Sequence, residues 1–110
     1  MPLYAVIALD HAPHSMALRE QFRAEHRAYV QAHDEGTRLA GAFYDTEGNQ
    51  CGTLMIFEAN SAEDVREWYR KEPFYKNNAY KEFHVTEWRL AFNQLERTSW
   101  VGDYPTKTKS

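Results

Sequence analysis

Two kinds of hydrophobic spacing follow one another along the chain. Residues Leu3–Leu9 form a short apolar run with β-branched members, closed by a polar turn, and a run of this length predicts a buried strand. From Ser15, which can cap a helix, apolar residues recur at intervals of three and four as far as Gly36, a residue suited to a helix C-cap. The spacing fits one helix, and it fits equally well two pieces of which the second starts near Arg23.

The segments that follow predict a hairpin and a second helix. Residues 37–44 and 51–58 are strand-like, and the polar residues 45–49 between them form a turn. Asn60 or Ser61 caps the second helix, and Pro73 ends it. A short irregular or helical piece then leads to a last strand, residues 83–89, in which apolar and polar residues alternate.

The resulting order βαββαβ predicts a ferredoxin-like α+β fold, an antiparallel four-stranded sheet with two helices on one face. Residues 1–92 would form this one domain, and residues 93–110 a partly mobile C-terminal extension. Residues 90–100 contain apolar side chains that fit a further strand or a cover, and residues 102–110, rich in Lys and Thr, are expected to fray. Two helices cover only one sheet face, and a monomer would expose the other. We therefore expect a homodimer in which two sheets stack into a dimeric α+β barrel.

Composition narrows the classes of function. A formal net charge of −3 over 110 residues argues against binding to nucleic acid, which needs clustered Lys and Arg. The single cysteine, Cys51, excludes an intramolecular disulfide and a cysteine metal cluster. No signal-peptide core and no apolar run near eighteen residues occurs, so we expect a cytoplasmic protein without a membrane partner.

Known sequence motifs for several reaction classes are missing. The chain has no glycine-rich phosphate loop, no HExxH and no GxSxG, so nucleotide hydrolysis, zinc proteolysis and α/β-hydrolase chemistry have no support in the sequence. We expect no cofactor.

One histidine and one glutamate, distant in sequence, form a candidate acid/base pair. A lone histidine such as His26 on an apolar helix face is more often a hydrogen-bonded core residue than a catalyst, and a glutamate such as Glu72 is more often simply solvated. Pro73 disfavours helical geometry at Glu72, and antiparallel helices on one sheet face would bring that carboxylate near His26. A carboxylate bound to one imidazole nitrogen fixes the tautomer and leaves the other nitrogen to transfer a proton.

Other polar and aromatic residues near this pair suit a substrate site. Arg23 and Arg27 are candidates for binding a substrate carboxylate. Tyr29, Tyr69 and Tyr75 are candidates for lining the site, and each fits a core or rim position as well.

The remaining histidines give weaker signals. His11 and His14 are spaced as zinc ligands can be, but without a third ligand they fit better in the loop after the first strand, and we expect no metal. His33 fits the end of its helix, and His84 a surface or interface position on the last strand.

Several short motifs, taken together, resemble the YCII-related family. The stretch Arg23-Ala24-Glu25-His26 is similar to its Arg-x-x-His motif, residues 34–41 to its helix end and glycine-bearing second strand, and Lys71-Glu72-Pro73-Phe74 to its Asp-Pro-aromatic element. The similarity runs from about residue 3 to residue 89.

The resemblance implies a dimeric ferredoxin-like α+β barrel with an active site built on a His/Asp pair. The family's superfamily includes muconolactone isomerase-like and chloromuconolactone-dehalogenase-like proteins, and most family members have no assigned reaction. The histidine corresponds to His26 and the acid to Glu72, so this chain has Glu where the family has Asp. It also has Asn77 and Asn78 where the family tends to have a small residue or glycine.

These observations favour a small enzyme in which His26, oriented by Glu72, moves a proton on a small organic substrate in an isomerisation, an elimination or lactone chemistry. A second hypothesis is a non-catalytic module that binds or senses a metabolite with the same polar groups. A third is a purely structural dimer.

Overall fold

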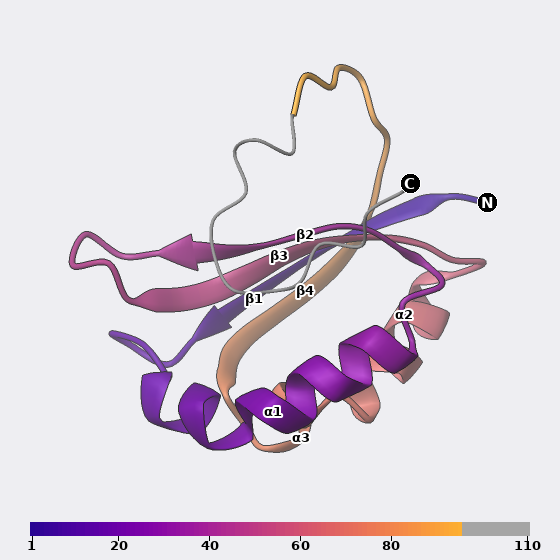
Figure 1. Cartoon of the computed structure of the whole chain (residues 1–110). Helices are drawn as coiled ribbons and strands as arrows, with labels where there is room; N and C mark the ends of the chain where they lie inside the picture. Colours follow the sequence, from indigo (N-terminus) through magenta and orange to yellow (C-terminus); the bar gives the residue numbers. More distant parts are fainter. Residues whose placement is uncertain (96–110) are drawn as a thin grey trace, which may run out of the picture.

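A computed structural model describes residues 1–95 of the chain. Its strands are β1 Leu3–Asp10, β2 Thr37–Tyr44, β3 Gln50–Glu58 and β4 Tyr80–Trp88. Its helices are α1 Met16–Ala32, α2 Ala62–Arg70 and the short α3 Pro73–Lys76. Figure 1 shows the three helices together on one face of the sheet.

The sheet has the strand order β2-β3-β1-β4, and every neighbouring pair is antiparallel. β1 is therefore a central strand, paired with β3 on one side and β4 on the other. This arrangement confirms the predicted ferredoxin-like α+β fold. The expected dimer involves a second chain and stays a prediction.

The hydrophobic core lies between the sheet and the helices. Alternate residues of β1 point into it, so that Tyr4, Val6 and Ala8 are all buried there, while Ile7 between them is partly exposed on the other face. Helix α2 adds Val65 to the same core. The core also contains Met55, Phe57, Tyr69, Phe74, Ala79 and Tyr80.

Helix α1 is continuous, so of the two alternatives left open by the spacing the single helix is the observed one. The region around Arg23 contains neither proline nor glycine, and nothing in it interrupts the helical hydrogen bonds. The prediction of Gly36 as the C-cap was wrong, because α1 ends at Ala32 and His33 is the C-cap. The expected position of His33 at the helix end is thereby confirmed.

Gly36 has a different role at the start of β2. Its carbonyl accepts a hydrogen bond from the Glu58 N–H at 2.8 Å, and a Cβ built on it would lie 2.7 Å from the Glu58 carbonyl oxygen. A glycine is therefore needed here because two backbone segments approach closely, and the left-handed cap conformation plays no part.

The chain around α2 and α3 shows how caps position the later elements. Ser61 caps α2, since its hydroxyl accepts a hydrogen bond from the Asp64 N–H at 3.1 Å. Helix α2 ends at Arg70, and Pro73 starts α3, where its missing N–H costs no hydrogen bond. The second helix therefore ends three residues before Pro73, and of the irregular or helical piece expected after it the helical one is observed. Strand β4 begins at Tyr80, three residues before the predicted start.

The sheet face opposite the helices carries exposed apolar residues. Ile7 of β1 and Leu39 of β2 lie on it and are partly exposed, and within residues 1–95 no helix covers this face. The predicted role of residues 93–110 concerns a segment that lies almost entirely outside the described residues. No helix within residues 1–95 is long and apolar enough to span a membrane.

Candidate active site

The structure brings His26 and Glu72 together. His26 lies on α1, Glu72 precedes α3, and the imidazole Nδ1 is 2.6 Å from the carboxylate Oε2. A carboxylate only accepts hydrogen bonds, so Nδ1 is the donor. The Glu72 side chain is completely buried, and that of His26 is 15 % exposed. The site therefore has one member shielded from water and one that solvent reaches.

Local backbone geometry holds Glu72 in place. The residue is extended, with φ −79° and ψ 128°, as expected before a proline, and it is the N-cap of α3. Its Oε2 accepts a second hydrogen bond from the Phe74 N–H at 2.9 Å, and Oε1 accepts one from the Tyr75 N–H at 3.2 Å. These fixed backbone donors leave the carboxylate a single orientation, the one that faces His26.

The ring of Phe74 lies against the imidazole of His26. The two ring centroids are 4.0 Å apart and the planes are 13° from parallel, so the rings are stacked. Phe74 is almost fully buried. The sequence reasoning missed this contact, although Phe74 belongs to the Glu-Pro-Phe segment from which Glu72 was taken. Its place directly after the proline was the available signal.

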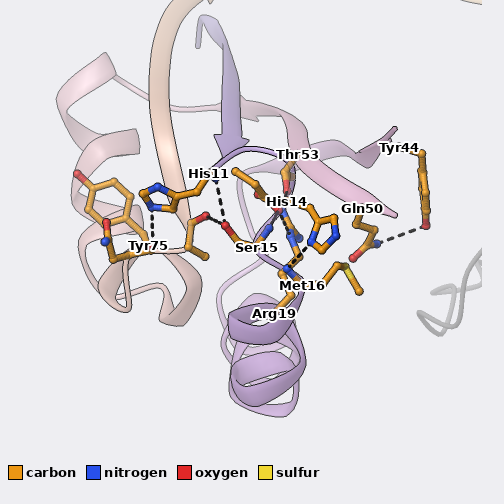
Figure 2. Close-up of polar contacts among 12 residues, drawn as sticks. His11, His14, Ser15, Met16, Arg19, Tyr44, Gln50, Thr53 and Tyr75 are labelled. Carbon is orange, nitrogen blue, oxygen red and sulfur yellow. Dashed lines mark hydrogen bonds and ion pairs between the residues drawn. The ribbon is translucent and has the colours of Figure 1, made fainter. Parts of the chain in front are cut away.

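A buried ion pair lies beside the same aromatic ring. Arg19 of α1 is only 3 % exposed and binds Asp10 at the end of β1 through two hydrogen bonds of 2.8 Å. Asp10 also accepts a hydrogen bond from the Ser15 N–H at 3.0 Å. The Arg19 guanidinium carbon is 5.2 Å from the centroid of the Phe74 ring. Figure 2 shows Arg19 and Ser15 pointing into this polar cluster, together with Thr53.

Arg19 and Asp10 were not among the predicted site residues. Arg19 is next to Leu18 and three residues before Phe22, and both of these apolar residues pack against the core. A charged residue beside such apolar positions was the signal that could have identified a buried ion pair. No feature of the sequence around Asp10 indicated that it would form an ion pair with Arg19.

The three predicted tyrosines occupy different environments. The Tyr29 hydroxyl donates to the Trp68 carbonyl at 2.6 Å, and burial followed by the negative charge of Glu72 raises its pKa. Tyr69 is buried in the core with its hydroxyl 2.9 Å from the Met55 sulfur, so of its two candidate positions the core is the one it occupies. Tyr75 is 39 % exposed and follows Phe74 on α3, at the edge of the site.

The two predicted arginines flank His26 on α1. Arg23 precedes the histidine by about one helical turn and is half-buried, and no hydrogen bond or ion pair within residues 1–95 engages its guanidinium. Arg27 follows His26 directly and is also half-buried. A half-buried cation of this kind is suited to binding an anionic group.

His11 and His14 do not converge. The His11 Nε2 lies 3.1 Å from the Asn78 carbonyl, whereas the His14 Nδ1 accepts a hydrogen bond from the Met16 N–H at 3.2 Å. Figure 2 shows the two imidazoles on different sides of Ser15. Within residues 1–95, no group of three or more His, Cys, Asp or Glu side chains is placed to hold a metal ion. His84 is exposed on β4 of the single chain, which fits both the surface and the interface position expected for it.

Comparisons with known proteins agree with this architecture. The model of the YCII-related domain matches residues 3–89. No curated protein matches the chain. Among solved structures, 5-chloro-2-hydroxyhydroquinone dehydrochlorinase from Burkholderia phenoliruptrix AC1100, in complex with 2,5-dihydroxybenzoquinone, is similar with a TM-score of 0.74 and 21 % identity. The match covers 81 % of this chain and 95 % of that one.

A second similar structure is more distant. A protein from Bordetella bronchiseptica, described as a putative antibiotic biosynthesis monooxygenase, has a TM-score of 0.48 and 19 % identity. That match covers 84 % of this chain and 100 % of the other. At these identities the likeness to the dehydrochlorinase concerns the fold, and the monooxygenase-like structure adds nothing to an argument about the reaction.

Proposed function

Because the chain belongs to the YCII-related domain family, we propose that it is an acid/base enzyme in which His26, oriented by Glu72, transfers a proton on a small organic substrate. The observation that carries this proposal is the 2.6 Å contact between the imidazole and a fully buried carboxylate. A buried carboxylate with fixed backbone donors is an arrangement that orients a general base.

The chemistry follows from the hydrogen bond at Nδ1. Glu72 holds the proton of the neutral imidazole on Nδ1, so Nε2 carries the lone pair that accepts a proton from the substrate. The imidazolium that forms is stabilised by the same carboxylate. In an isomerisation, Nε2 returns the proton to another atom of the substrate. In an elimination, the electron pair left on the substrate expels a leaving group, and the proton is released afterwards.

The neighbouring side chains favour an anionic substrate. Arg23 and Arg27 flank the histidine and would bind a carboxylate or an enolate oxygen, which lowers the energy of the charge that develops when a proton leaves carbon. Tyr75 would border the substrate on the side of α3, and Tyr29, whose hydroxyl binds the Trp68 carbonyl, on the side of α2. The dehydrochlorinase of similar fold is an enzyme, with a hydroxylated quinone bound, and it supports small-molecule catalysis on this architecture.

The test is a panel of small hydroxylated quinols, lactones and keto acids, assayed for product and for uptake of solvent deuterium into the substrate. Deuterium uptake detects proton transfer even where no net product forms. We expect His26→Ala to lower the rate by about 10²–10⁴-fold, the usual contribution of a general acid or base. His84→Ala is the matched control, because it removes an imidazole that is 63 % exposed on β4 and remote from Glu72, and its sedimentation is compared with that of wild type because His84 is the register partner of Ile7.

Two results would contradict the proposal. A substrate turned over by His26→Ala at the wild-type rate would exclude His26 as the base. A ligand that wild type binds without product and without deuterium uptake, and that His26→Ala binds more weakly, would instead support the metabolite-binding module.

A further inference from the structure

Phe74 contacts both members of the proposed dyad with different parts of the same residue. Its ring stacks on the His26 imidazole at 4.0 Å, and its backbone N–H donates to the Glu72 Oε2 at 2.9 Å. That oxygen is the one that accepts the hydrogen bond from His26. A single residue therefore contacts the plane of the imidazole and one oxygen of its carboxylate acceptor.

A buried cation, Arg19, is another neighbour of the Phe74 ring. Arg19 and His26 are seven residues apart on α1, which places them two turns or about 10.5 Å apart along the helix axis. The ring centroid of Phe74 is 4.0 Å from the imidazole and 5.2 Å from the guanidinium carbon, so the ring fits between the two side chains. The paired hydrogen bonds to Asp10 hold the guanidinium in place.

We propose that Phe74 is a positioning residue, clamped between Arg19 and His26, that keeps the imidazole in line with Glu72. Stacking on a fixed ring restricts rotation of the imidazole about its Cβ–Cγ bond, and this rotation would break the Nδ1 hydrogen bond. The catalytic meaning of this inference rests on the proposed function, whereas the positioning itself is measurable without any substrate.

The measurement is the low-field proton resonance of the His26 Nδ1–H, assigned by its absence in His26→Ala. A proton in a short, shielded hydrogen bond exchanges slowly with water and is visible by NMR. In Phe74→Leu, which keeps the backbone N–H and removes the ring, we expect this resonance to be lost through exchange. Phe83→Leu is the matched control, because Phe83 packs on Tyr69 and Tyr75 in the same core and should leave the resonance unchanged.

A second variant tests the part played by the ion pair. Asp10→Asn combined with Arg19→Met removes both charges together and so avoids leaving one buried and unpaired. Here we expect broadening of the resonance, because Phe74 is kept but its ring loses the contact with Arg19. An unchanged resonance in this double variant would remove Arg19 from the clamp.

The outcomes separate this inference from the proposed function. An Nδ1–H resonance in Phe74→Leu that matches wild type would overturn the positioning role, whatever substrate is found. If the resonance is lost but no substrate is ever turned over, the clamp stands and the enzyme proposal fails. With a substrate in hand, Phe74→Leu should lower kcat on the order of 10²-fold with little change in KM, since a misplaced base affects the reacting geometry.

Discussion

Replacing Glu72 should destabilise the fold by an amount set by how many hydrogen-bond donors lose their acceptor. The fully buried carboxylate accepts from the His26 Nδ1 and from the N–H groups of Phe74 and Tyr75. Each buried donor left without an acceptor costs about 1–3 kcal/mol. Glu72→Ala removes the acceptor from all of them, and we expect a loss of about 3–5 kcal/mol, as for other buried pairs from which one partner is removed.

Glu72→Gln is the more discriminating variant, because it has nearly the same shape. If the amide oxygen takes the place of Oε2, it keeps the 2.6 Å and 2.9 Å bonds to His26 and Phe74, while the amide NH₂ faces the Tyr75 N–H. A single donor then loses its acceptor, and the remaining bonds lose the negative charge that strengthens them. We expect Glu72→Gln to cost about 1–2 kcal/mol, less than the alanine variant.

Urea unfolding followed by tryptophan fluorescence measures both losses as shifts in the midpoint at a constant slope. Glu63→Gln on α2 serves as the control, because that side chain is 62 % exposed and should leave the midpoint unchanged. Equal losses for Glu72→Gln and Glu72→Ala would show that the bonds from His26 and Phe74 contribute nothing, and an alanine variant as stable as wild type would refute the argument altogether.

Three further predictions concern other parts of the molecule. Burial raises the pKa of Tyr69 and Tyr80, and the negative charge of Glu72 acts in the same direction. The stability that is present below about pH 10 should therefore fall as the pH rises further. The tyrosinate absorbance of these two residues should appear only together with the loss of the far-ultraviolet circular dichroism. Gly52→Ala places a Cβ 2.8 Å from a carbonyl oxygen of β1 and should lower the free energy of unfolding by about 1–3 kcal/mol. Gly41→Ala has open space around the new Cβ and should be neutral or stabilising by about 0.4–1 kcal/mol. Urea midpoints measure both changes. Ile7→Glu on the sheet face opposite the helices should convert a homodimer to a monomer in sedimentation velocity, and a wild-type protein that sediments as a monomer would exclude the dimer.

The sequence predicts the order of elements well because local signals define them. The apolar run of β1, the Ser61 cap and the polar turn between β2 and β3 each depend on residues that are neighbours in the chain. The predictions fail where a contact with a residue distant in sequence determines the local conformation. Gly36 resembles a helix cap locally, but its conformation is set by the backbone of Glu58, which is remote in sequence.

The residues of the candidate site likewise fall into those that the sequence could predict and those that it could not. His26 and Glu72 could be named because a proline marks the break at Glu72 and because the fold's topology brings the two helices together. Phe74 and the Asp10–Arg19 pair could not be assigned a role, since each depends on side-chain packing across α1, α3 and β1 that hydrophobic spacing does not specify. An apolar ring in a core and a charged pair under a helix have the same sequence pattern whether or not a dyad lies beside them.

The glutamate at position 72 is itself testable against the aspartate that the family resemblance implies. Capping bonds to the second and third N–H groups of a helix are usual for aspartate, so Glu72→Asp should keep an acceptor for Phe74 and Tyr75. Removing one methylene draws the carboxylate back by about 1.5 Å, which is too far for the 2.6 Å bond to His26 unless α1 moves toward α3. We therefore expect Glu72→Asp to cost about 1–2 kcal/mol, because one donor, the His26 Nδ1–H, loses its acceptor, and to lose the low-field Nδ1–H resonance. Retention of that resonance would show that α1 adjusts to the shorter acid, and that the length of this side chain does not set the geometry of the dyad.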